Sequence, residues 1–193
     1  MQQNNRTSFY SEQELKEIGF KSLGRNVKVS QFARFYGVKN ISLGNNVRID
    51  DFCILSGNID IGSYVHIASF SALFGSGGIE IYDFAGLSSK VTIYSASDDY
   101  LGDALTGPCI PDEYRKVESG KVELMKHALI GASSVVLPNT ILREGAVVGA
   151  MSLAKGDILE WSIFAGVPAK FIKSRKKEII ISFENEILNN GEL

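Results

Sequence analysis

The chain is poor in several residue types on which common functional sites depend. Its 193 residues include two histidines, two cysteines, four prolines and one tryptophan. A zinc site built on three histidine ligands is therefore excluded, and two cysteines do not make a disulfide framework. The net charge is −2, and no run of lysine or arginine resembles a nucleic-acid-binding arm. Nothing in the charge pattern predicts a nucleic-acid partner or an anionic membrane surface.

Long apolar runs are also missing. No stretch approaches the length of a membrane span, and the first residues are polar and lack the apolar centre of a signal peptide. We therefore expect a cytoplasmic protein with no membrane partner. At 45% hydrophobic content, the chain can bury one sizeable core as a single domain.

What the sequence does contain is a six-residue period of apolar residues. One run is Leu43, Ile49, Leu55, Ile61, Ile67, Leu73 and Ile79, and a second is Leu124, Ile130, Val136, Leu142, Val148 and Ala154. Helices and strands have side-chain periods of about 3.6 and 2.0, so neither explains a hexad. Six residues fit one flat side of a solenoid in which three sides complete a coil. The period predicts an all-β fold, a parallel β-helix of triangular section.

The predicted corners of this solenoid repeat as well. LGRNV from Leu23, LGNNV from Leu43 and IGSYV from Ile61 place glycine or a polar residue at equivalent positions. Small residues allow a sharp bend there, and glycine and asparagine tolerate positive φ. The hexad phase slips by two residues at 38–41 and again at 75–78, where an extended corner would restore the register. Cys53 falls on a small inward position and should pack as a small hydrophobe.

The two ends differ from the coils, which we expect over residues 23–172. Ser11 and Glu14 form a capping-box pattern ahead of an apolar stretch that Gly19 stops, which predicts a short helical cap within residues 1–22. A C-terminal helical tail is predicted over residues 173–193. Its helical face would carry Ile179, Ile180, Phe183 and Ile187. Both end pieces would hide coil edges that could otherwise pair with other chains.

One segment interrupts the solenoid. Over residues 95–120 the hexads disappear, and prolines, glycines and acidic residues take their place. A loop of this length inside a compact repeat array is usually functional, the alternative being a solvated decoration.

These features together resemble a known family. The hexads, the long loop, the run HALIGASSVVLPNTILREGAVVGAMSLAKGDI from His127 and the segment AGVPAKFI from Ala165 resemble the left-handed β-helix, hexapeptide-repeat acyltransferases. The resemblance covers nearly all of residues 23–174 and is greatest to sugar acyltransferases, which use acetyl-CoA or another acyl-CoA. It implies a homotrimer with active sites between neighbouring subunits and CoA near the C-terminal coils. Val65, His66 and Phe70 are expected on outward faces that could pack around the threefold axis.

The resemblance also points to a catalytic residue. In the maltose and galactoside acetyltransferases the loop opens with a short segment ending in a histidine, the general base, and the matching residue here is Asp98. A sugar hydroxyl needs a base with a pKa near neutral, such as histidine. An amine that has lost one proton is already a good nucleophile, and a carboxylate can orient it. Asp98 therefore favours N-acylation of a nucleotide-linked amino sugar, of the kind used for surface polysaccharides, over O-acetylation.

Four other side chains are candidates for the site. Glu123, where the chain re-enters the coil after the loop, should project outward and pair with Asp98 around an ammonium group. Ser88 could hydrogen-bond the sugar, although a polar corner position explains it equally well. His127 is expected to point to solvent. His66 lies on an outward position and could face a neighbouring subunit.

CoA binding is expected to depend mainly on backbone. Ala132 and Ala150 each follow a glycine and would leave a coil edge open to the pantetheine chain. The Ala132 amide could also stabilise the thioester oxyanion. Lys155, Lys170 and Arg175 are expected to supply cations for the CoA phosphates. Gly166 and Pro168 should form a bend that resembles the adenine pocket of the family. No metal is expected.

Two alternatives to an N-acyltransferase remain open at this stage. The first is an O-acetyltransferase acting on a sugar or an antibiotic, which would need one of the two histidines as its base. The second is a non-catalytic β-helix with a role in assembly. The AGVPAKFI segment and the long loop argue against the second, because an assembly module needs neither.

Overall fold

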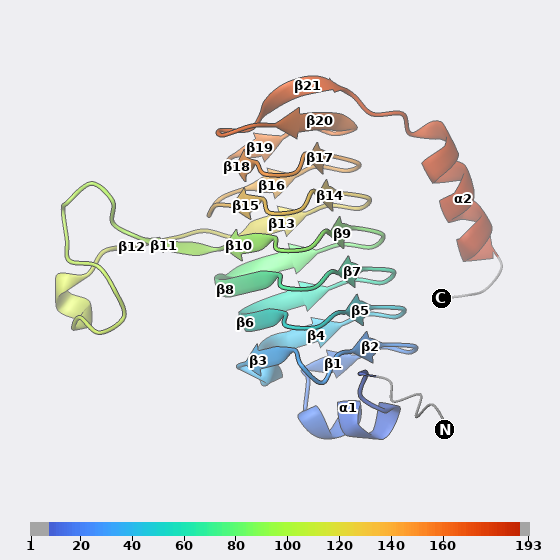
Figure 1. Cartoon of the computed structure of the whole chain (residues 1–193), viewed down its shortest axis with the longest axis horizontal. Helices are drawn as coiled ribbons and strands as arrows, with labels where there is room; N and C mark the ends of the chain where they lie inside the picture. The colour runs from blue at the N-terminus through green and yellow to red at the C-terminus, as the bar shows by residue number, and fades with distance from the viewer. Residues whose placement is uncertain (1–7, 190–193) are drawn as a thin grey trace, which may run out of the picture.

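The chain folds into a stack of about seven coils, with a helix at each end and one arm that projects from the stack (Figure 1). The computed structural model describes residues 8–189. The outermost parts of the predicted cap and tail, residues 1–7 and 190–193, lie outside the described residues. None of the helices in the described part is long and apolar enough to cross a membrane.

Each coil has three sides. Side 1 contains β1 (Ser22–Leu23), β4 (Ile41–Leu43), the second parts of β6 (Ile54–Ile61) and β8 (Ala72–Ile81), β13 (Val122–Leu124), β16 (Ile141–Leu142) and β19 (Asp157–Ile158). Side 2 contains β2 (Lys28–Val29), β5 (Arg48–Ile49), β7 (His66–Ile67), β9 (Gly86–Leu87), β14 (Leu129–Ile130), β17 (Val147–Val148), β20 (Ser162–Ala165) and β21 (Lys170–Ser174). Side 3 contains β3 (Arg34–Tyr36), the first parts of β6 and β8, β10 (Thr92–Tyr94), β15 (Val135–Val136) and β18 (Leu153–Ala154).

Neighbouring strands on every side pair in parallel, except β20 and β21, which are antiparallel. We call the bend that follows side 1 the first corner, the bend after side 2 the second corner, and the bend after side 3 the third corner. The parallel β-helix predicted from the hexads is confirmed.

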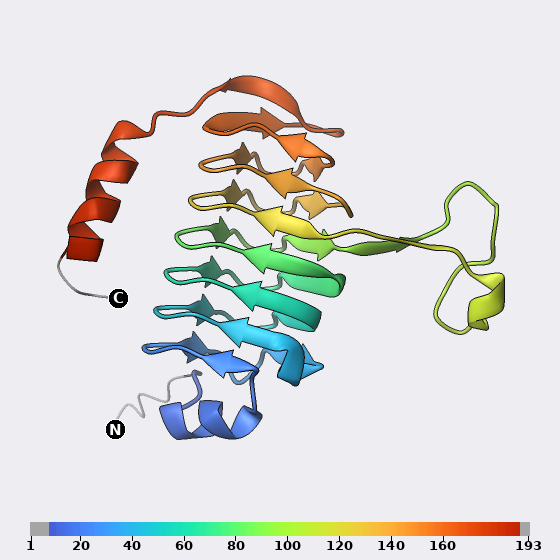
Figure 2. The same ribbon diagram turned by 180° about the vertical axis from the view of Figure 1, so that it is seen from behind.

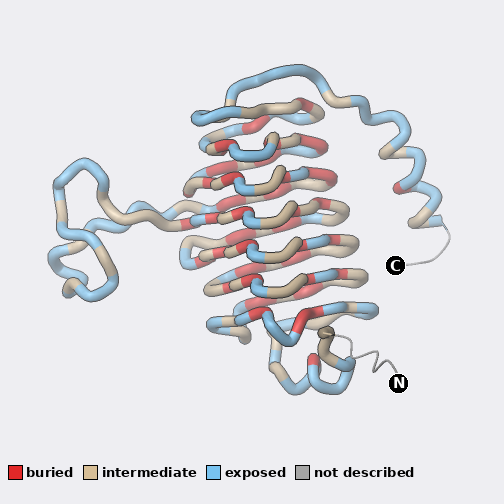
Figure 3. Tube along the Cα trace, in the orientation of Figure 1, coloured by how far each residue is buried: buried red, intermediate tan, exposed pale blue. Residues whose placement is uncertain are grey.

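The core is the column of hexad residues inside the coils (Figure 3). Every residue of both runs is buried, with at most 3% of its surface exposed. Equivalent positions stack directly, so that Leu43 pairs with Leu23 below it and Ile61 above it. Each buried leucine or isoleucine stabilises the fold by about 1.5–3 kcal/mol relative to an exposed one. Because each coil can bury its apolar residues only against its neighbours, the column is also what holds the coils in register.

The corners show why glycine and asparagine recur. A Cβ on Gly24 would lie 2.3 Å from the Gly44 carbonyl oxygen, and one on Gly44 would lie 2.6 Å from the Gly62 carbonyl oxygen, so these glycines allow close stacking of backbones. Positive φ falls instead two residues later, at Asn26 (54°) and Asn46 (55°). Both predicted two-residue slips are present. The first is the 3-10 turn η1 (Val38–Asn40). The second falls at 75–78, because Gly57 pairs with Gly75 whereas Ile59 pairs with Ile79.

The predicted inward position of Cys53 is confirmed. Its thiol is fully buried, and burial raises the pKa of Cys53 to about 11. The side chain is therefore a packing group rather than a nucleophile. One outward prediction is wrong: Val65 is 1% exposed because its position on the first corner points into the core.

The N-terminal helix α1 (Glu12–Ile18) closes the first coil as predicted. Ser11 and Glu14 make the reciprocal capping-box hydrogen bonds, and Gly19 ends the helix at φ 83°. Leu15 is 2% exposed and joins the apolar column. The open edge of the solenoid is thus covered by an apolar helical face.

The C-terminal helix α2 (Glu178–Asn189) leaves the last coil and returns alongside the first corner (Figure 2). The predicted helix is confirmed, although Ile179 and Phe183 of its apolar face are 69% and 58% exposed. The residue of α2 that is buried against the coils is Glu184.

The expectation that His127 points to solvent is also wrong. Its ring is 6% exposed, stacks on Phe84, and places Nε2 2.6 Å from Glu184 Oε2. Lys126 forms a second ion pair with Glu184. The sequence position of His127 on a corner is outward, but α2 folds back over that corner and removes the ring from water.

The Glu184 contacts predict an acid-sensitive tail. Burial alone would raise the pKa of Glu184, but hydrogen bonds from Lys126 and His127 lower it below its ordinary value of 4.5. Carboxylate pairing therefore stabilises the docked helix above about pH 4.5 and is lost as the pH falls through the lowered pKa. Fluorescence of Trp161, the single tryptophan, should report undocking on acidification because its ring lies 6.0 Å from that of His127.

The Glu184→Gln variant should lack this acid transition and hold α2 more weakly at neutral pH. Glu186→Gln, on the exposed side of the same helix, is the matched control and should titrate like the unchanged protein. An identical transition in Glu184→Gln would assign the acid sensitivity to another group.

Candidate active site

The long loop leaves the solenoid at the third corner and is closed at its base by one hydrogen bond. Gly120 donates its N–H to the Ser95 carbonyl at 2.8 Å. Beyond this bond, β11 (Ala96–Asp98) and β12 (Val117–Ser119) form an antiparallel ribbon that carries the 3-10 turn η2 (Asp112–Tyr114) at its far end. Figures 1 and 2 show the ribbon continuing outward from β10, away from its own coils.

Asp98 lies at the end of β11 and ties three parts of the loop together. Its Oδ2 accepts the Gly107 N–H at 3.2 Å, and its Oδ1 accepts a hydrogen bond from an Arg115 terminal nitrogen at 3.4 Å. The carboxylate is partly exposed, at 32%. Asp98 thus has a structural role in the loop as well as an accessible carboxylate. Arg115 was not predicted from the sequence, where its signal is a lone arginine among the acidic residues of the loop.

Glu123 projects outward from β13, as predicted, but the predicted pairing with Asp98 is not formed. Its carboxylate shares Lys121 with Glu80, at 3.4 Å and 2.8 Å from the lysine nitrogen. The hydrogen bond to Glu80 is the main reason that the pKa of Lys121 is raised. The two predicted catalytic carboxylates separate because the ribbon carries Asp98 away from the coils while side 1 retains Glu123.

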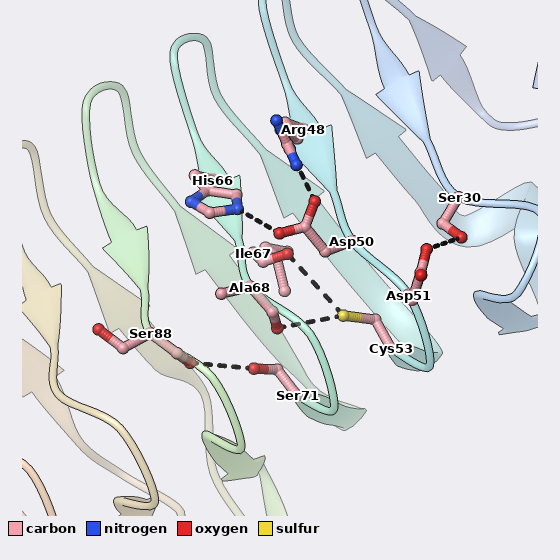
Figure 4. A network of polar contacts seen from close by, with 10 residues as sticks. All are labelled: Ser30, Arg48, Asp50, Asp51, Cys53, His66, Ile67, Ala68, Ser71 and Ser88. Atoms are coloured by element: carbon pink, nitrogen blue, oxygen red, sulfur yellow. Dashed lines mark hydrogen bonds and ion pairs between the residues drawn. The ribbon is translucent and has the colours of Figure 1, made fainter. Parts of the chain in front are cut away.

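Ser88 lies at the second corner, directly after β9. Its N–H donates to the Ile130 carbonyl at 2.9 Å, and its carbonyl accepts the Ser71 hydroxyl at 3.1 Å. In Figure 4 the Ser88 hydroxyl points away from Ser71. Ser88 and Asp98 lie at opposite ends of side 3, since β10 runs between them.

His66 is outward, as predicted, and lies on side 2. Its Nε2 is 2.7 Å from Asp50 Oδ2, and Asp50 Oδ1 also accepts the Arg48 Nε–H at 2.7 Å (Figure 4). The Asp50 side chain is only 14% exposed, whereas that of His66 is 51% exposed. Asp50 fixes the orientation of the imidazole, whose side chain stays half exposed.

A row of amides without partners runs along the second corner. Within residues 8–189, the N–H groups of Ser89, Ala132 and Ala150 have no hydrogen-bond acceptor, and none of these residues is buried. A Cβ on Gly131 would lie 2.4 Å from the Ala150 nitrogen, so glycine is needed to keep the backbones this close. An extended chain of amides such as pantetheine fits a row of free donors of this kind.

The remaining candidates for CoA binding lie at two different corners. Gly166 and Pro168 form the bend after β20, at the second corner, where the Gly166 carbonyl accepts the Leu153 N–H at 3.0 Å. Lys170 is exposed on β21 nearby, whereas Lys155 is exposed at the third corner.

Arg175 anchors the start of the C-terminal tail to the first corner. Its guanidinium donates to the carbonyls of His127 and Gly145 at 2.8 and 2.9 Å, and burial lowers its pKa. Both hydrogen bonds come from the same terminal nitrogen, Nη1.

Known proteins similar to this chain identify its family. No family model matches the chain. It is 48% identical to a dTDP-4-amino-4,6-dideoxy-D-glucose acyltransferase of Escherichia coli over 90% of this chain and 92% of that protein. The chain belongs to the hexapeptide-repeat acyltransferases.

Solved structures agree with this family. AntD, an N-acyltransferase of Bacillus cereus solved with dTDP and 3-hydroxybutyryl-CoA, is 52% identical and superposes with a TM-score of 0.94 over 97% of this chain and all of AntD. The hexapeptide-repeat acetyltransferase VCA0836 of Vibrio cholerae matches with 18% identity and a TM-score of 0.58 over 85% of this chain and 79% of its own, which shows the shared fold.

The amide row predicts a specific effect of substitution in this acyltransferase. Gly131→Ala forces the Ala150 backbone to move, which should cost about 1–3 kcal/mol of stability by overpacking. Displacing the Ala150 amide should weaken acyl-CoA binding by about five- to tenfold, measured by calorimetry. The control is Gly86→Ala, whose Cβ would lie an ordinary 3.5 Å from Leu129. Equal CoA affinity in both variants would remove the amide row from the acyl-CoA site.

Proposed function

We propose that this acyltransferase transfers an acyl group from acyl-CoA to the amine of a dTDP-linked 4-amino-4,6-dideoxy sugar. The support is identity at or near half over nearly the whole chain. The E. coli relative is named for dTDP-4-amino-4,6-dideoxy-D-glucose, and AntD has been crystallised with dTDP-4-amino-4,6-dideoxyglucose and CoA. The alternatives of an O-acetyltransferase and an assembly protein lack support of this extent.

The spacing of two residues supports the proposed catalytic group. AntD has been crystallised with one serine replaced by alanine, cysteine or threonine, and with one aspartate ten residues later replaced by alanine or asparagine. In this chain Ser88 and Asp98 are also ten residues apart. This agreement favours Ser88 and Asp98 as the residues that contact the acceptor sugar, and leaves Glu123 outside that set.

Each residue then has a definite task. Asp98 accepts hydrogen bonds from the sugar amine, holds its nitrogen in line with the thioester carbon, and takes the proton released as the tetrahedral intermediate collapses. Ser88 provides a hydroxyl for the sugar. The Ala132 amide donates to the developing oxyanion. Ala132 and Ala150 bind the pantetheine amides, and Gly166, Pro168 and Lys170 bound the adenine end.

A trimer would bring these parts together. In one chain Asp98 lies on a ribbon that projects from the third corner, while Ser88 and the amide row lie at the second corner. A neighbouring copy can place its ribbon over this corner and complete the site. Exposed apolar groups that such a contact would cover include Phe52 and Phe70, stacked at 5.0 Å. We further propose a cytoplasmic enzyme that serves surface polysaccharide synthesis.

The acceptor is tested by CoA release over a panel of substrates. We expect turnover with dTDP-linked 4-amino sugars, using acetyl-CoA and 3-hydroxybutyryl-CoA as donors, and none with the 4-hydroxy sugar. The rate should rise with pH as the acceptor ammonium loses its proton. Light scattering of the same samples should give three times 21.1 kDa. Turnover on the hydroxyl and none on any amine would overturn the proposal.

The base is tested by Asp98→Asn. This variant should lower turnover by about 10²-fold to 10⁴-fold while acyl-CoA binding stays intact. His66→Asn is the comparison, because an amine acceptor needs no imidazole, and it should retain most of its activity. A collapse of turnover in His66→Asn, with an unaltered Asp98→Asn, would move the base to His66.

A further inference from the structure

Arg115 is a half-buried cation that the proposed mechanism does not use. Its side chain is 19% exposed, and its two terminal nitrogens contact Asp98 at 3.4 Å and Asp112 at 3.2 Å. Its Nε–H is buried and has no partner among the described residues. A buried donor of a charged group is seldom left unpaired without a reason. The guanidinium therefore contacts the proposed base, Asp98, while its Nε–H has no hydrogen-bond acceptor among the described residues.

The contacts leave room at Asp98 for another donor. A carboxylate has about four lone-pair sites, and Asp98 uses one on each oxygen, for Gly107 and for Arg115. An acceptor amine can bind at a remaining site without displacing either. It would then lie a few ångströms from the guanidinium.

Two positive charges at this distance repel, which disfavours the protonated form of the amine. The Asp98 carboxylate has the opposite effect, because it favours the ammonium that it binds, and Arg115 offsets that effect. Asp112 is 98% exposed, so water screens it, and Lys116 pairs with Asp103 at 2.9 Å. The charged side chains in contact with Arg115 are Asp98 and Asp112. Asp103, Glu113 and Lys116 line, together with Arg115, an open cavity of about 560 Å³.

We propose that Arg115 is a positioning residue with two effects, holding Asp98 in place and favouring the neutral, nucleophilic form of the acceptor amine. This inference rests on the proposed N-acyltransferase function. The acceptor ammonium releases one proton to solvent, and the free amine forms the C–N bond. Asp98 takes the second proton as the C–S bond breaks, and returns it to the departing CoA thiolate.

The test is the pH dependence of turnover with a dTDP-linked 4-amino sugar and acetyl-CoA. In Arg115→Gln the rising limb of the pH–rate profile should move to higher pH by about one unit, the usual effect of one nearby charge. Turnover near neutral pH should fall about tenfold and recover at alkaline pH. Arg115→Lys keeps the charge and should keep the limb in place. Arg143→Gln removes an arginine paired with Asp157 on side 1, and serves as the control for loss of one charge.

Hydrogen exchange of the Gly107 amide shows whether the loop is intact in each variant. A limb that stays in place in Arg115→Gln, with the loop ordered, overturns the inference and leaves the N-acyltransferase function standing. If Arg115→Gln disorders the loop, Arg115→Lys decides, and a displaced limb in that variant also overturns it. If the protein without any substitution shows no turnover on any amine, the proposed N-acyltransferase function itself is wrong.

Discussion

The direct stacking of equivalent positions, one strand spacing apart, is the constraint on which the rest of this structure depends. Leucine and isoleucine fill the inside because each coil can bury them only against the coil above and below. Glycines at the corners are needed because the neighbouring backbone lies closer than a side chain allows, as at Gly24 and Gly131. The same stacking turns any single feature of a corner into a row. The unpaired amides of the second corner are one such row, and a binding surface for an extended ligand follows from the repeat itself.

A stack of this kind can accept a long insertion only at a corner, where the ladders on either side are undisturbed. The chain uses the third corner, and the hydrogen bond from Gly120 to Ser95 closes the gap, so that β13 continues the stack above β8. The cost is that the inserted ribbon has no coil beneath it. Its order comes from polar contacts instead, including the hydrogen bonds that Asp99 accepts from four backbone amides. The carboxylate proposed as the base is held in the same way.

The two carboxylates that the sequence presented as partners contact different cations. Glu123 contacts a lysine on side 1 that it shares with Glu80, and Asp98 contacts Arg115 on the ribbon. Partial burial distinguishes the two cations, since the Lys121 side chain is 43% exposed and the Arg115 side chain 19%. Water screens the first more than the second. The ribbon therefore has the stronger local field, beside the group proposed to bind the amine.

The sequence by itself determined the solenoid, its inward residues, the helix α1 and the span of the inserted loop, because these follow from local periods and from capping patterns that neighbours in sequence satisfy. It also named Asp98 by resemblance, and Glu123 and Ser88 as further candidates for the site. Tertiary structure decided what depends on segments distant in sequence. His127 is buried because α2 returns over its corner, Glu123 is parted from Asp98 because the ribbon points outward, and Arg115 reaches Asp98 across the loop. No local pattern encodes these contacts, since each is set by where a chain excursion comes back to the coils.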